Sequence, residues 1–240
     1  MKRLGIFLAI AFAGVAVYVA VFSTTVRYRL TLEAEVDGRV KTGSGVIEVT
    51  YSKNNDPISQ AEFSIDVRGE AVVLDLGSRG TLFALLKGDT DGRSGPEYLV
   101  LRAFDLPGGA LPRPIVSGLR QVQQLSGERE LPLTTLPLLV RFRDLNDPLT
   151  VERVDPLDLE KSFGPSVKLT RATLEIVPAG IWPFSWLGIT GEPLTTGIET
   201  RLPWWNGPFP WLRPLGGGVF ADTRTEKLKA NKEDFKIGLR

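Results

Sequence analysis

VRYRLTLEAEVDG, residues 26–38, is the stretch that decides the fold of this chain. Its apolar residues alternate strictly with charged or polar ones, at Val26, Tyr28, Leu30, Leu32, Ala34 and Val36. A period of two is typical of a strand with one buried face and one face in water. Asp37-Gly38 is a preferred dipeptide for a tight hairpin turn, because both central residues need positive φ. The stretch therefore predicts a long strand that turns back on itself.

The return strand is predicted over residues 39–53, and it places three apolar residues on one face, Ile47, Val49 and Tyr51. Gly43 and Gly45 would allow a bulge or bend in this strand. Other apolar runs lie between Gly- and Pro-rich turns. They predict further strands at residues 63–67, 71–76, 81–86, 98–104, 138–142 and 167–176.

Two short helices and one bulge are predicted farther along the chain. Residues 115–125 carry apolar side chains at helical spacing. Asp155-Pro156 is a favourable helix start, and Gly164 would end that helix after about two turns. The apolar phase slips by one residue near Thr170, which indicates a bulge. The body is thus predicted to be mainly β, an antiparallel sandwich or barrel-like domain with a few short helices.

Residues 4–22, LGIFLAIAFAGVAVYVAVF, are nineteen uncharged residues preceded by Lys2 and Arg3. A helix of this length covers roughly 28 Å, close to the ~30 Å hydrocarbon core of a bilayer. We expect an N-terminal transmembrane helix within residues 1–25, with the amino terminus inside and the body outside. The alternative is a cleaved signal peptide, whose apolar stretch is usually shorter. For that alternative only Val21 with Ser23 offers a passable cleavage pair.

The composition excludes several kinds of chemistry. The chain has no Cys and no His, which rules out disulfides, thiol nucleophiles, Cys or His zinc sites and imidazole-dependent triads. Its 29 Lys and Arg nearly balance its 28 Asp and Glu. No strong field would therefore draw the protein to nucleic acid. We predict no cofactor, no metal site and no nucleic-acid partner.

Four blocks of the sequence together resemble an uncharacterised family of bacterial proteins with one N-terminal membrane segment. They are YRLT at residues 28–31, KTGSGVIEV at 41–49, the stretch 146–169, and TTGIETRLPW at 195–204. The similarity spans most of the body. It implies a bacterial source and the anchored layout. Because the family has no assigned activity, the resemblance implies no functional residue.

All five tryptophans lie between residues 178 and 215, in a Pro-rich segment, as Trp182, Trp186, Trp204, Trp205 and Trp211. Three interpretations compete for this possible aromatic contact surface. The rings could stack on sugars, lie at the headgroup level of the membrane, or pack over the sheet as irregular core. Packing is favoured, because large aromatic residues dominate burial in most folds. Within the segment, Thr196 and Glu199 have the spacing of a capping box for one helical turn.

The body is expected to span residues 26–220, and residues 221–240 are expected to form a charged C-terminal tail, mobile or a solvated helix. With no His or Cys, any catalysis would have to use carboxylates, Lys, Ser or Tyr. Glycosidases need only two carboxyls across a cleft. Candidates for such a pair are Asp144, Asp147, Glu175 and Glu192.

The function that the sequence favours is contact rather than chemistry. We expect a non-catalytic structural or binding component of the bacterial envelope, held in the inner membrane by one span, with its body in the periplasm and no catalytic residue. Its partner would be an envelope protein or glycan. Two alternatives stay open: a carboxylate-dependent envelope glycan hydrolase, and a domain that docks on the membrane through the Trp-rich segment.

Overall fold

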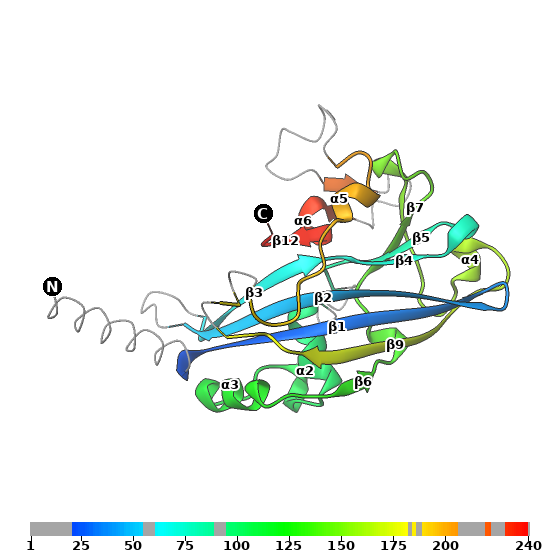
Figure 1. The fold of residues 1–240 in the computed structure, drawn as a ribbon. Helices are drawn as coiled ribbons and strands as arrows, with labels where there is room; N and C mark the ends of the chain where they lie inside the picture. The colour runs from blue at the N-terminus through cyan, green and yellow to red at the C-terminus, as the bar shows by residue number, and fades with distance from the viewer. Residues whose placement is uncertain are drawn as a thin grey trace, which may run out of the picture.

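The computed structural model describes residues 21–54, 61–88, 95–181, 184–185, 189–205, 219–221 and 229–239. Over these residues the chain is mainly β, with antiparallel strands and a few short helices, which confirms the β-rich prediction (Figure 1). None of the described helices is long and apolar enough to cross a membrane. Residues 1–20, which hold nearly all of the expected anchor, lie outside the described residues.

The strands are β1 Ser23–Val36, β2 Arg39–Lys53, β3 Phe63–Glu70, β4 Val72–Asp75, β5 Thr81–Ala84, β6 Glu128–Glu130, β7 Leu139–Phe142, β8 Val151–Arg153, β9 Val167–Val177, β10 Val219–Ala221, β11 Lys229–Asn231 and β12 Lys236–Ile237. The helices are α2 Pro96–Ala103, α3 Ile115–Gln123, α4 Glu160–Phe163, α5 Ile198–Arg201 and α6 Lys232–Phe235. The first sheet has the order β12-β3-β2-β1-β9-β6, the second has the order β4-β5-β7-β8, and β10 pairs with β11.

The hairpin of β1 and β2 forms as predicted. Asp37 and Gly38 occupy its turn with φ of 50° and 75°, and the register runs unbroken back to Ser23 opposite Ser52. The alternating apolar residues of β1 are all buried. Because successive strand residues point to opposite faces, this places one whole face of the first sheet in the core.

Gly43 serves a purpose other than the expected bulge, since the pairing of β1 with β2 has no register shift there. Strand β4 crosses β2 at this point. A Cβ added to Gly43 would lie only 2.2 Å from the carbonyl oxygen of Val73. Glycine is therefore needed because two backbones approach each other closely.

Strand β9 pairs with the other edge of β1 and contains the predicted bulge. The register shifts between Glu33, which faces Arg171, and Ala34, which faces Leu169. Thr170 is left as the extra residue, and its hydroxyl donates to the Glu33 carbonyl at 3.0 Å. The phase slip in the sequence is thus confirmed as a break in strand pairing.

Two helices and the second sheet cover the core face of the first sheet. Helices α2 and α3 pack on it, and the second sheet packs on it through β4 (Figure 1). Helix α3 confirms the predicted amphipathic helix, whereas α2 replaces a predicted strand at residues 98–104. Pro96 begins α2 and Glu97 lies in its first turn, both of which favour a helix start. A short apolar run does not distinguish helix from strand by its period.

The second sheet is buried on its other face as well. There, large aromatic side chains form a second core with α5 and α6, namely Phe83, Phe142, Trp204 and Phe235. Phe235 is fully buried, and β12 continues from it to pair with β3. Residues 232–237 therefore pack into the fold, which differs from the expected solvated tail. The segment has few apolar residues, but one of them fills the centre of this core.

The short helices differ in detail from their predictions. Asp155 accepts from the amide of Leu157 in a turn, and α4 itself begins later and has a single turn that ends at Gly164. Helix α5 is the predicted single turn, but it begins after Gly197 without a side-chain cap from Thr196. The amide of its first residue, Ile198, donates instead to the carboxylate of Glu70 at 2.7 Å. Glu70, which is distant in the sequence, thus accepts the hydrogen bond that the capping box of Thr196 and Glu199 was expected to provide.

Candidate functional site: an apolar loop held by a buried arginine

Arg27 lies on the face of β1 that the sequence predicts to be in water, yet it is only 3% exposed. It is buried because the chain returns over this face after β9. We call the described residues 178–181, 184–185 and 189–192 the apolar loop. Sequence reasoning missed Arg27, since a charged residue on the polar face of an amphipathic strand is ordinarily solvated.

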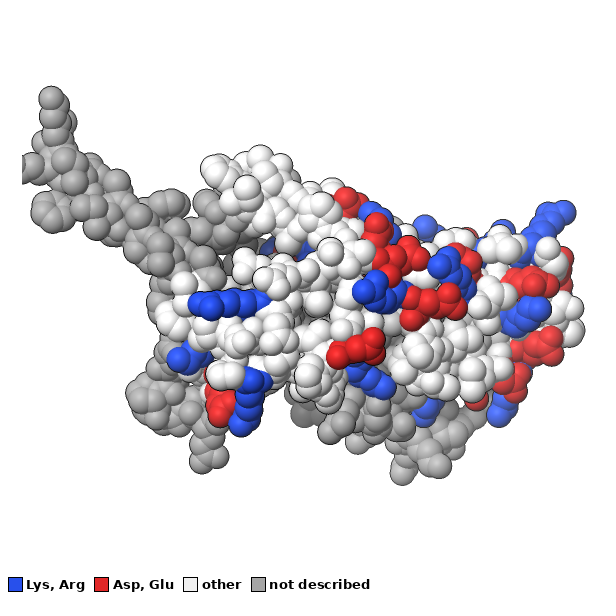
Figure 2. Space-filling model, turned by 90° about the horizontal axis from the view of Figure 1, so that it is seen from below, with Lys and Arg blue, Asp and Glu red and all other residues white. Residues whose placement is uncertain are grey.

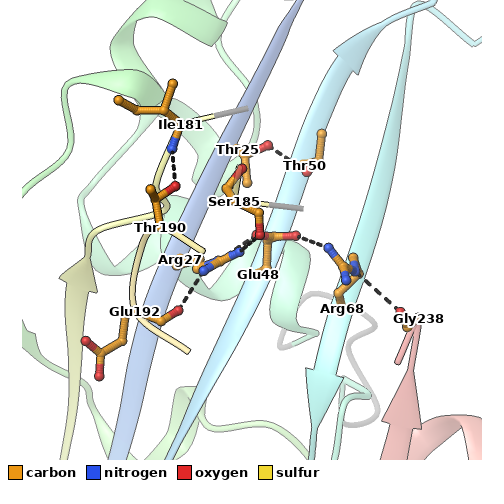
Figure 3. A network of polar contacts seen from close by, with 10 residues as sticks. All are labelled: Thr25, Arg27, Glu48, Thr50, Arg68, Ile181, Ser185, Thr190, Glu192 and Gly238. Carbon is orange, nitrogen blue, oxygen red and sulfur yellow. Dashed lines mark hydrogen bonds and ion pairs between the residues drawn. The ribbon is translucent and has the colours of Figure 1, made fainter. Parts of the chain in front are cut away.

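The guanidinium of Arg27 joins the apolar loop to the sheet (Figure 3). Its Nε donates to the Glu48 carboxylate at 2.6 Å, and Nη1 and Nη2 donate to the carbonyls of Glu192 at 2.6 Å and Ser185 at 3.2 Å. The other oxygen of Glu48 accepts from Arg68 at 3.0 Å. A buried charge needs a partner and further hydrogen bonds, and both are present for Arg27.

The apolar loop is closed at its base by its own hydrogen bonds. The amide of Glu192 donates to the carbonyl of Pro178 at 2.7 Å, and the amide of Ile181 donates to the hydroxyl of Thr190 at 3.0 Å. Gly180, with φ of 78°, allows the two arms to touch, because an added Cβ would lie 2.4 Å from the Thr190 carbonyl oxygen. Ends that meet in this way are typical of an Ω-loop.

The outer surface of the apolar loop exposes large hydrophobic side chains. Ile181 is 71%, Phe184 51% and Ile189 67% exposed. Val177, the last residue of β9, lies opposite Arg27. After Val177 the loop extends toward Thr25 and the start of β1, and the chain then returns to Glu192 beside Arg27 (Figure 3). The exposed apolar residues thus belong to the same end of the molecule as Ser23.

The four candidate carboxylates fall into two pairs, each with its own structural partners. Glu175 and Glu192 each lie 2.6 Å from the guanidinium of Arg29 on β1, and both are partly exposed at the base of the apolar loop. Asp144 and Asp147 lie in the turn that precedes β8, where their side chains accept from the amides of Asn146 and Leu149. All four side chains have structural partners. Over the described residues, no three acidic side chains converge as a metal site would require.

Two of the five tryptophans lie among the described residues. Trp204 is 2% exposed and packs against Phe142 and Phe235 at 5.7 and 6.2 Å between ring centroids, as the packing interpretation predicts. Trp205 is half-buried beside it, with the Lys232 ammonium 5.1 Å from the ring centroid. Trp182, Trp186 and Trp211 lie outside the described residues.

Basic side chains lie at the same end of the molecule as the start of β1. Lys53 follows the residue that pairs with Ser23, and its ammonium lies 5.3 Å from the centroid of the Phe22 ring. Lys53 also lines an open hollow of about 410 Å³ at the N-terminal end of α3, together with Arg113. On the face shown in Figure 2, most acidic side chains gather on the half away from this end.

Comparisons of the chain with models of protein families, with curated proteins and with solved structures found no match.

Proposed function

We propose that the protein is a membrane-anchored, non-catalytic component of the bacterial cell envelope, whose β-rich body acts through contacts. The amino terminus would lie inside, residues 4–22 would span the inner membrane, and the body would lie in the periplasm. The bacterial setting rests on the resemblance of the four sequence blocks.

One observation carries this proposal: β1 begins at Ser23, directly after the nineteen-residue apolar stretch that ends at Phe22. A transmembrane helix followed at once by the central strand of a six-stranded sheet would leave no flexible linker. The body would then be held at the bilayer surface. The Lys53 ammonium lies 5.3 Å from the centroid of the Phe22 ring, where a long basic side chain at the end of a span would reach the headgroup region.

The carboxylate environments favour a contact function over glycan hydrolysis. A glycosidase needs two carboxyls that face a sugar across a groove, one of them as a proton donor. Glu175 and Glu192 share Arg29, and Asp144 and Asp147 hold a turn. Each of these side chains has a role in the fold that accounts for its position.

The absence of cysteine allows a direct test of topology. Leu157→Cys, at a side chain that is 67% exposed, would be treated with a membrane-impermeant maleimide in intact spheroplasts. We expect labelling without lysis, and we expect the protein to stay in the membrane fraction after an alkaline carbonate wash. Release by the wash, or labelling only after lysis, would contradict the proposed layout. Crosslinking in the same cells, followed by identification of co-purifying proteins and glycans, would then define the partner.

A further inference from the structure

We propose that the apolar loop inserts into the bilayer through Ile181, Phe184 and Ile189, in the leaflet on the side of the body. This inference rests on the proposed function, because it needs the chain to be anchored next to the loop. The body would then contact the membrane at two places, the N-terminal segment and the apolar loop, and its orientation would be fixed.

Exposed apolar side chains are concentrated at one end of the molecule. Within the described ranges, the large hydrophobic residues that are exposed are Val21, Val40, Leu149, Leu157, Ile181, Phe184 and Ile189. Three of these seven belong to the apolar loop, and Val21 lies two residues before the start of β1. Single exposed apolar residues are ordinary on a protein surface, but a cluster indicates an interaction site.

The position of the loop favours lipid as the occupant. Its base lies beside Arg27, four residues after Ser23, which corresponds to ~13 Å along a strand. From this base the loop extends toward the start of β1, so its tip lies closer to Ser23 than its base does (Figures 1 and 3). Peripheral apolar segments bury themselves roughly 5–10 Å into the boundary between headgroups and acyl chains.

The charges at this end agree with a lipid surface. Lys53 and Arg113 lie beside the start of β1, where phosphate headgroups would be, and Glu62 pairs with Arg113 at 3.1 Å. On the face in Figure 2, most acidic side chains lie on the other half of the molecule, where they alternate with Lys and Arg. Apolar residues flanked by Lys and Arg are typical of segments that bind anionic lipid surfaces.

Hydrogen bonds among its described residues fix the base of the apolar loop. Its base is closed by the Pro178–Glu192 and Ile181–Thr190 hydrogen bonds, and Arg27 binds two of its carbonyls. A surface that is already ordered loses little conformational entropy on binding. The buried arginine is thus a positioning residue for the apolar loop.

The test uses the full chain, which contains no cysteine, in vesicles of phosphatidylethanolamine and phosphatidylglycerol. Phe184→Cys and Ile189→Cys would each carry an environment-sensitive fluorophore. Leu157→Cys is the matched control, because its exposure of 67% equals that of Ile189 and because it precedes α4, at the far end of the first sheet (Figure 1). The unfolding midpoint of each labelled variant in detergent would confirm that it is folded.

We expect blue-shifted emission at residues 184 and 189. Lipids that carry a nitroxide near the headgroup should quench these two sites roughly two- to threefold more than residue 157, because only inserted residues meet the acyl boundary. Equal quenching at all three sites would overturn the inference. A blue shift that is lost on dilution with lipid, without nitroxide quenching, would overturn it in favour of contact between two copies of the chain.

The same samples separate this inference from the proposed function. Retention of the protein in vesicles after a carbonate wash reports on the anchor, whereas quenching reports on the apolar loop. An anchored protein with a solvent-exposed loop would remove only the inference. Quenching in a protein that the wash releases would support insertion of the loop and contradict the anchor.

Discussion

The two halves of β1 are buried in different ways. Near its start, Val26, Arg27 and Tyr28 are three consecutive buried residues, whereas from Arg29 to Val36 burial alternates strictly. At Arg27 the strand is closed on both faces, by the core on one side and by the apolar loop on the other, whereas Thr25 on the loop side is exposed. The second half is closed on one face only. One strand thus has two environments, and residues 158 and 165 positions away in the sequence create the difference.

Two arginines on the polar face of the sheet form ion pairs that differ in burial. The side chain of Arg27 is 4% exposed, and its pair with Glu48 has a distance of 2.6 Å. The side chain of Arg171 is 43% exposed, and it meets Glu128 and Glu130 at 3.1 and 3.4 Å. Exposed pairs contribute little to stability, whereas loss of one partner from a buried pair leaves an uncompensated charge.

The largest effect is expected from Arg27→Met. The substitution keeps much of the side-chain volume but leaves Glu48 with only Arg68 and leaves two loop carbonyls without their donor. We expect the free energy of unfolding to fall by about 3–5 kcal/mol. Urea unfolding of the full chain in detergent would measure it. A loss below about 1 kcal/mol would show that the two halves of β1 are energetically alike.

A second, smaller effect should appear at high pH, from Tyr28 near the start of β1 and Tyr51 on the paired strand β2. Burial raises the pKa of Tyr28 and of Tyr51, and the carboxyl of Glu97 raises both further. Their hydroxyls donate to the carbonyls of Pro96 and Glu97 in α2. The unfolded chain loses these protons near pH 10, while the folded chain keeps them.

Stability is therefore complete below about pH 10 and falls above it, by about 1.4 kcal/mol per pH unit for each tyrosine. Urea unfolding between pH 9 and pH 11 would measure this slope. Tyr28→Phe and Tyr51→Phe should each remove one tyrosine's contribution to this pH dependence, because phenylalanine has no proton to lose. If the free energy of unfolding falls equally steeply with pH in the double variant, titratable groups other than Tyr28 and Tyr51 cause the fall.

Local pattern predicted the parts of this fold that depend on local chemistry. The alternation of β1, its Asp37-Gly38 turn and the bulge at Thr170 were all readable, because period and turn residues are properties of neighbouring positions. Gly43 forms no bulge with β1, and the reason for glycine there is the close approach of β4, which the sequence of β2 does not indicate. Helix α2 was mistaken for a strand because an apolar run of a few residues has no distinct period.

The candidate site could not be predicted from the sequence, because it also depends on contacts between residues that are distant in the chain. Arg27 occupies a position that the pattern assigns to water, and only the return of the chain after β9 buries it. Trp204 is core, as the favoured packing interpretation of the aromatic segment predicts. The exposed residues were the less conspicuous Ile181, Phe184 and Ile189, which lie among prolines and glycines. A segment rich in apolar residues but unable to form a regular element is the signal that could have indicated them.

A smaller change is expected at the open half of β1. Arg171 faces Glu33 across the strand pair and also meets Glu128 and Glu130. Because these groups are solvated, Arg171→Met should cost far less stability than Arg27→Met, and added salt should diminish the cost further. The same unfolding experiment at low and high salt would measure this. A loss as large as that of Arg27→Met would contradict the contrast between buried and open faces.

The smallest effect on stability is expected at the tip of the apolar loop. Phe184→Ser removes a side chain that is 51% exposed and contributes no side-chain hydrogen bond to the loop. In detergent the free energy of unfolding should therefore fall by only about 1 kcal/mol or less, as expected for a half-buried phenylalanine. Folding accounts for only part of the burial of this phenylalanine, so its exposed half calls for an external contact. A substantial loss of stability would instead mean that Phe184 packs within the protein, and the contrast between a buried base and an open tip would then fail.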